Sequence, residues 1–96
     1  MIFEWDPDKA ERNLRKHGVS FEVAATVFDD PLHLSMTDPV SSIKEERWIT
    51  VGRSVDHRVV LVVQTYRLQR GDDEVIRIIS ARAATRKEKG QYEEGI

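Results

Sequence analysis

The strongest constraint on the fold is a run of apolar, mostly β-branched residues in the second half of the chain. Residues 59–63 read Val-Val-Leu-Val-Val and belong to the most β-prone segment of the sequence, Arg58 to Tyr66. Side chains of a strand alternate between its two faces, so this run is apolar on both of them. A strand of this kind is buried from both sides, and we therefore place it at the centre of a sheet.

Other segments are expected to pair with this central strand. The dipeptide Asp56-His57 predicts the turn before it, and a longer hairpin connection over residues 68–73, which contains Gly71, follows it. Because hairpins join neighbouring strands in this order, the pairing is expected to be antiparallel. Strands are expected at residues 2–5, 32–36, 46–54, 58–66 and 74–81.

Helix signals flank the strands. Asp6 is a good N-cap for a helix from about Pro7 to His17, Ser20 caps a second helix that Asp30-Pro31 ends, and a third runs from about Thr85 to Glu94. The order β-α-α-β-β-β-β-α predicts an α+β fold, with an antiparallel sheet, two N-terminal helices and one C-terminal helix.

Length and composition limit the domain organisation and the location. We expect residues 1–96 to form a single domain, because a chain this short builds one modest core. Hydrophobic content of 40% is far from the composition of disordered segments. The sequence has no cysteine and no apolar run of membrane-spanning length, and its N-terminus lacks the features of a signal peptide. We expect a cytoplasmic protein without a membrane segment.

Charge is unevenly distributed along the chain. The net charge of −2 argues against general affinity for nucleic acids, which depends on Lys and Arg. However, residues 9–17 carry four Lys and Arg side chains against one acid, and residues 77–89 carry five against one. If these two stretches converge in space, an anionic ligand is expected; if they do not, they are solvated helix faces.

Arg77 needs a specific explanation, because it lies within an otherwise apolar strand. Alternation places Arg77 and Ile79 on one face, with Ile78 and Ser80 on the other. A cation on an inner face is costly unless it is paired or faces solvent. A structural ion pair with a glutamate and a functional role both satisfy this requirement.

The remaining residues favour one kind of chemistry. The three histidines are far apart, no two have the spacing of helical metal ligands, and no glycine-rich phosphate loop or nucleophile motif occurs. No metal and no cofactor is therefore expected. A histidine, His17, and several arginines are what metal-free RNA cleavage needs, namely a proton carrier and cations for the phosphate. His17 also suits a purely structural role, because a cation is favourable at a helix C-terminus.

Three further arginines have two interpretations. Arg47 and Glu46 can form a cross-strand ion pair, or Glu46 can serve as a base while Arg47 holds a phosphate. Arg82 and Arg86 are spaced like neighbours on a helix and can be either a solvated face or a phosphate clamp.

Several segments together resemble one known family, the BrnT toxins of type II toxin–antitoxin systems. The resemblance extends from Phe3 to about Glu93, and its most specific parts are residues 16–21, Lys-His-Gly-Val-Ser-Phe, and residues 77–82, Arg-Ile-Ile-Ser-Ala-Arg. The other matching positions are Phe3 to Asp6, Lys9, Asn13, Ala24, Val27, Phe28, Asp30, Pro31, Glu46 to Trp48, Gly52, Ala84 to Arg86, Glu88 and Tyr92.

The resemblance implies a RelE-like endoribonuclease that cleaves RNA without a metal ion and arrests growth. It also implies a BrnA-type ribbon-helix-helix antitoxin, through which alone the toxin would contact operator DNA. Transferred by position, the family motif implies that His17, Arg77 and Arg82 are catalytic and that Lys16, Arg47 and Arg86 bind the substrate.

Two positions depart from the expected pattern. Position 83 is Ala where a cation is expected, and Gly90 interrupts the last helix. These departures and the negative net charge support an alternative hypothesis, a catalytically inactive module that only binds an antitoxin or DNA.

Overall fold

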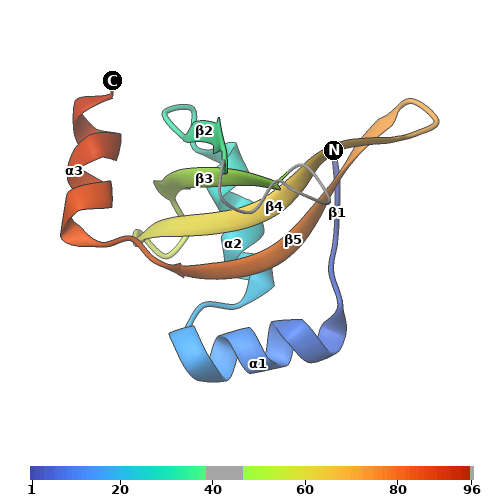
Figure 1. The fold of residues 1–96 in the computed structure, drawn as a ribbon, viewed down its shortest axis with the longest axis horizontal. Helices are drawn as coiled ribbons and strands as arrows, with labels where there is room; N and C mark the ends of the chain where they lie inside the picture. Colours follow the sequence, from blue (N-terminus) through green and yellow to red (C-terminus); the bar gives the residue numbers. More distant parts are fainter. Residues whose placement is uncertain (39–46, 96) are drawn as a thin grey trace.

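The structure, a computed structural model, describes residues 1–38 and 47–95, with the backbone alone described for residues 66–69. A five-stranded sheet with the order β1-β5-β4-β3-β2 forms its centre (Figure 1). The strands are β1 (Ile2–Glu4), β2 (Leu34–Thr37), β3 (Arg47–Arg53), β4 (Val59–Arg70) and β5 (Asp73–Ala83). The helices are α1 (Pro7–His17), α2 (Phe21–Ala25), the 3₁₀ helix η1 (Thr26–Asp29) and α3 (Arg86–Glu94).

The pairing of the strands confirms the α+β fold class. β4 is central and pairs antiparallel with β3 and β5, and β2 pairs antiparallel with β3. β1 departs from the expected pattern, because it pairs in parallel with β5 and makes the sheet mixed. The two strands lie at opposite ends of the chain and no hairpin joins them, so the order of the elements does not determine their relative direction.

The two faces of the sheet differ in what covers them. One face, here called the helix face, packs its Val60, Val62, Ile78 and Ala81 side chains against the segment around α2, including Phe21. Figure 1 shows α2 behind the sheet and α1 alongside β5. The opposite face, here called the α3 face, carries Val51, Val59 and Leu61, which pack against Tyr92 of α3.

The helices begin and end where the sequence predicts. Asp6 caps α1 by accepting a hydrogen bond from the Asp8 N–H at 2.9 Å, and Gly18 ends it with a φ of 70°. The Ser20 hydroxyl accepts from the Val23 N–H at 3.1 Å at the start of α2, which continues as η1 and ends at Asp30. None of the helices in residues 1–38 and 47–95 has the length and apolar character needed to cross a bilayer.

The connection between β4 and β5 is shorter than predicted. The expected connection over residues 68–73 is wrong, because β4 continues to Arg70 and β5 begins at Asp73. Only Gly71, with a φ of 65°, and Asp72 remain as the turn. A two-residue turn of this kind favours glycine and matches the twist of long antiparallel strands. The result is a hairpin arm that projects beyond the rest of the sheet (Figure 1).

An irregularity in β5 corrects the predicted assignment of its faces. Val63 is opposite Ser80 and Gln64 is opposite Ile78, which leaves Ile79 as an extra residue, as in a β-bulge. The prediction that Ile78 and Ser80 share a face is therefore wrong, since Ile78 packs in the core of the helix face. Instead Arg77, Ser80 and Arg82 follow one another on the α3 face, because they are opposite Thr65, Val63 and Leu61 of β4.

Candidate active site

The edge of β5 is covered by a helix instead of a strand beyond the point where β1 ends. β1 pairs with β5 only from Val75 to Arg77. Next to the later part of β5, Asn13 of α1 donates to the carbonyls of Ala81 at 2.8 Å and Val19 at 2.9 Å, and accepts from the Ala81 N–H at 3.1 Å. The Asn13 amide, which is 8% exposed, thus makes the contacts that a strand backbone would make. It holds α1 in place along β5.

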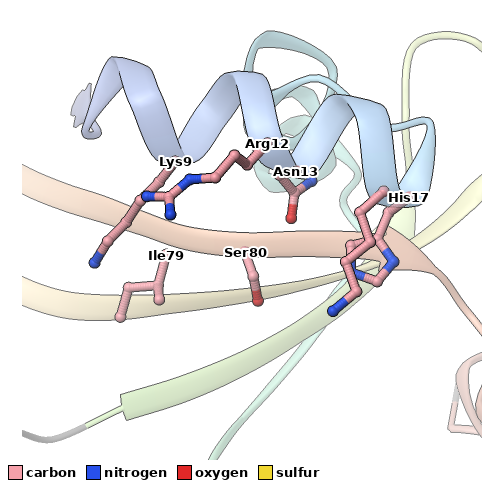
Figure 2. A pocket seen from close by; sticks show the side chains of 7 residues that line it. Lys9, Arg12, Asn13, His17, Ile79 and Ser80 are labelled. Carbon is pink, nitrogen blue, oxygen red and sulfur yellow. The ribbon is translucent and has the colours of Figure 1, made fainter.

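A groove of about 390 Å³ lies between α1 and this edge (Figure 2). We call it the α1 groove. It is lined by Lys9, Arg12, Asn13, Lys16, His17, Ile79 and Ser80. Three of these side chains are cations, one is an imidazole and none is acidic, so the groove suits an anionic ligand.

Charges on α1 are separated according to the side of the helix. Lys9, Arg12 and Lys16 recur at intervals of three and four residues and line the groove. Arg15 is outside the groove and forms an ion pair with Glu11. Within the described part of the chain, no ion pair involves any of the three groove cations. Their positive charge is therefore available to a ligand.

His17 and Lys16 lie at one end of the α1 groove, in the last turn of α1. Both are exposed. Figure 2 shows the His17 imidazole beyond Ser80, at the opposite end from Lys9 and Ile79. This position favours a cation through the helix dipole and also exposes an imidazole to a groove ligand.

Arg47 and Arg77 lie on the α3 face of the sheet. Arg47, Thr65 and Arg77 form one row across β3, β4 and β5. Two strand spacings separate the arginine backbones by roughly 10 Å. Arg77 is 44% exposed and its Nη1 lies 3.7 Å from the Glu4 carboxylate, so it forms a loose ion pair. Ser80, which is next to Arg77 on this face, also lines the α1 groove and links the two areas.

Arg82 is held in a closer ion pair. Its Nη1 and Nη2 donate to the two carboxylate oxygens of Glu88 at 2.7 and 2.9 Å. Glu88 also accepts from the Thr85 N–H at 2.8 Å, which completes a capping box at the start of α3. Hydrogen bonds from Arg82 lower the pKa of Glu88 from 4.5 to about 2, and those from Thr85 add to this effect. The same pairing raises the pKa of Arg82.

The structure thus brings some of the predicted site residues together and separates others. Lys16 and His17 share the α1 groove, and Arg47 and Arg77 share a row on the α3 face. Arg82 is paired with Glu88, and Arg86 is an exposed residue at the start of α3. Glu46, considered as a partner of Arg47, lies outside the described residues.

Glu88→Gln should lower the free energy of unfolding by about 1–2 kcal/mol at pH 7, because it removes a charge-assisted pair. The lowered pKa of about 2 corresponds to a larger loss in free energy of unfolding. The expected loss is smaller because the Arg82 side chain is 39% exposed and solvent screens the pair. A depressed pKa contributes stability above the unfolded value of 4.5, and that stability is lost as the pH falls toward 2. Urea unfolding at several pH values measures this: the difference from wild type should shrink between about pH 5 and pH 2.

The matched control is Glu93→Gln, which makes the same change at an exposed position of α3. It should leave the unfolding midpoint within error of wild type. Equal losses of stability for the two substitutions would show that the ion pair does not stabilise α3. So would a loss for Glu88→Gln that does not depend on pH.

Sequence reasoning did not identify several residues that shape the site. The sequence places Asn13 only in the family pattern, because the burial of its amide, which indicates that it binds backbone groups, is visible only in the structure. Lys9 and Arg12 belong to a basic stretch of the sequence that does not mark them as site residues. The predicted face of Ser80 is wrong because nothing in the run Ile78-Ile79-Ser80 indicates where a bulge occurs.

Two other observations concern metals and aromatic residues. In residues 1–38 and 47–95, no three His, Asp or Glu side chains gather in a group that could hold a metal ion. Trp5 packs edge-on against Phe21, with ring centroids 5.9 Å apart, and Tyr92 is buried with its hydroxyl donating to Asp30 at 2.5 Å. These two aromatic residues have packing roles.

Comparisons with known proteins give one family and one fold. The family model described as "Ribonuclease toxin, BrnT, of type II toxin-antitoxin system" matches residues 5–88. The 1.1 Å crystal structure of the ribonuclease toxin BrnT of Brucella abortus has a similar fold, with a TM-score of 0.59 and 20% sequence identity. The similarity covers 90% of this chain and 100% of that one, and at this identity it shows the fold alone. No curated protein sequence is a significant match.

Proposed function

Because the chain belongs to the BrnT family of ribonuclease toxins of type II toxin–antitoxin systems, we propose that it is an endoribonuclease that cuts RNA without a metal ion. The observation that carries this proposal is the α1 groove, where an imidazole and three cations line a single surface without any acid. RNA offers such a groove a chain of phosphates, and its ribose hydroxyl offers the imidazole a proton.

The proposed reaction uses the ribose 2′-OH as the nucleophile. Neutral His17 accepts the hydroxyl proton while the 2′ oxygen forms a bond to the adjacent phosphorus. The bond from phosphorus to the 5′ oxygen breaks, and that oxygen takes a proton from water. The products are a 2′,3′-cyclic phosphate and a 5′-hydroxyl, so no metal-activated water is required for the step.

Cations are needed because negative charge builds up on the phosphate oxygens during this step. Lys16 lies beside His17 in the groove, and Arg82 lies on the His17 side of Ser80 in β5. We assign Arg82 to stabilising the transition state and Lys16 to binding the phosphate. Arg77 contacts Glu4 of β1 and precedes Ile79, so it extends the cationic surface at the Lys9 end, while Arg47 and Arg86 bind phosphates that approach over the α3 face.

The proposed partner is a BrnA-type ribbon-helix-helix antitoxin that neutralises the toxin and connects it to operator DNA. The support is that the family is described as a toxin of type II toxin–antitoxin systems, which implies an antitoxin partner. The toxin itself then needs no DNA-binding surface.

The direct test is RNA cleavage by the purified protein in the presence of EDTA. We expect fragments that end in a 2′,3′-cyclic phosphate, at a rate that added Mg²⁺ does not raise. Intact RNA at stoichiometric protein, or cleavage only after Mg²⁺ is added, would contradict the proposal.

Expression in bacteria distinguishes the proposed function from the binding-module hypothesis. The protein alone should arrest growth, and co-expression of the antitoxin should restore it. A protein that binds an antitoxin while both growth and cellular RNA remain intact would support the binding module instead.

A further inference from the structure

We propose that Lys9 and Arg12 form a second phosphate-binding subsite, which extends the RNA site along α1 and away from His17. The inference rests on the proposed function, because it takes His17 as the position of the reacting phosphate. It goes beyond that function by making the preferred substrate a single-stranded oligonucleotide with several phosphates instead of a single phosphodiester.

The first argument is the length and direction of the α1 groove. Lys9 and Lys16 are seven residues apart in one helix, which separates them by roughly 10 Å along its axis. Successive phosphates of a stacked strand are about 3.4 Å apart along the axis, so this length spans about three phosphate spacings. Figure 2 shows the order along the groove: Lys9 beside Ile79, then Arg12 and Asn13 above Ser80, then His17.

The second argument is the absence of acids from the groove. An ordinary solvated helix face mixes charges of both signs, as α1 does where Glu11 pairs with Arg15. Among the described residues, no acid forms an ion pair with Lys9 or Arg12, and the Arg12 Nε donates to the Asp8 carbonyl at 3.4 Å. Like charges three and four residues apart destabilise a helix slightly, and a bound anion would offset this repulsion.

The third argument is that the groove has a fixed wall. Asn13 lies between Arg12 and Lys16 in sequence, and its hydrogen bonds to Ala81 fix this part of α1 along β5. The bulge places the half-buried Ile79 side chain at the Lys9 end, where it offers an apolar contact to a sugar or base. Contacts to phosphates and an apolar side chain tolerate any sequence, so this subsite is expected to bind without strong base preference.

The test measures binding of 2′-O-methyl RNA, which lacks the reactive hydroxyl, as a dinucleotide and as a hexanucleotide. The dissociation constant is followed as salt is raised, because each phosphate contact to a single strand contributes about 0.7 to the slope of log K against log salt. Lys9→Ala with Arg12→Ala should lower the slope for the hexanucleotide by about 1.4 and change that for the dinucleotide by less than about 0.3.

Arg15→Ala is the matched control, because it removes one cation from the same helix at an exposed position outside the groove. Arg15→Ala should leave the salt slope for the hexanucleotide nearly unchanged, whereas Arg12→Ala should lower it. Equal slopes for these two single substitutions, or equal effects of the double substitution on both oligonucleotides, would overturn the inference.

Cleavage of unmodified hexanucleotide separates this inference from the proposed function. The double substitution should raise KM about tenfold or more while kcat changes less than about threefold, because the subsite is remote from the reacting bond. If the wild-type protein cleaves the hexanucleotide and the double substitution leaves KM unchanged, the subsite is overturned and the ribonuclease function is not. The expected salt slopes in a wild-type protein that cleaves no RNA would support the subsite and reject the ribonuclease.

Discussion

Replacing His17 by alanine should slow RNA cleavage by about a hundredfold or more, measured as the single-turnover rate at saturating RNA. The expected cause is loss of the group that accepts the 2′-OH proton, since the His17 side chain is exposed in the α1 groove. Stability should fall by no more than about 1 kcal/mol, because the structural role of this side chain is limited to the helix terminus.

A second histidine provides the control for this experiment. His57 lies in the turn between β3 and β4, is exposed, and has a φ of 68°. His57→Asn keeps a residue that tolerates this backbone conformation, so the protein should fold and cleave at the wild-type rate. Equal rates for His17→Ala and His57→Asn would show that another group transfers the proton.

Chemical rescue distinguishes proton transfer from a structural role. Free imidazole added to the His17→Ala protein can enter the open α1 groove and replace the missing group. We expect it to restore part of the cleavage rate in proportion to its concentration and to have little effect on wild type. A rate that does not respond to imidazole would favour the structural role at the end of α1.

The fold could be predicted to the extent that local signals determine it. The central position of β4 follows from an apolar run, and the ends of α1 and α2 follow from Asp6, Gly18 and Ser20, each of which acts on its own neighbours. The parallel pairing of β1 with β5 could not be predicted in this way. It joins segments about 70 residues apart, and only packing of the whole chain determines their direction.

The candidate site shows the same division between local and non-local information. Lys16 and His17 are neighbours on one helix, so the sequence alone places them together. Simple alternation predicts the wrong face for Ser80, because a single extra residue in β5 reverses the alternation after it. The pairing of Arg82 with Glu88 cannot be predicted from the sequence either, because it depends on how α3 turns back at Thr85.

These placements divide the cations into two groups with different surroundings. Arg77 contacts Glu4 and Arg82 binds Glu88, so acids already compensate two cations of the α3 face. Lys9, Arg12 and Lys16 have no acid in the α1 groove. The negative net charge therefore does not conflict with binding RNA, because what matters is where the acids are located.

The second large effect is expected from Asn13→Asp, which should lower the free energy of unfolding by about 3 kcal/mol at pH 7 and the Tm by roughly 15 °C. The Asn13 amide donates to the carbonyls of Val19 and Ala81, and a carboxylate of the same shape cannot donate to either. The substitution also buries a negative charge beside two carbonyl oxygens, at a position that is 8% exposed. Urea and thermal unfolding measure the loss.

Dependence on pH and a second substitution identify the cause. Burial beside two carbonyls raises the pKa of the introduced carboxyl above its unfolded value, so its penalty should diminish, relative to wild type, as the pH is lowered through that raised value. Asn13→Ala introduces no charge and should show a loss that does not vary with pH. If Asn13→Asp unfolds at the same urea concentration as wild type, this amide does not hold α1 on β5, and the α1 groove loses the contact that fixes its shape.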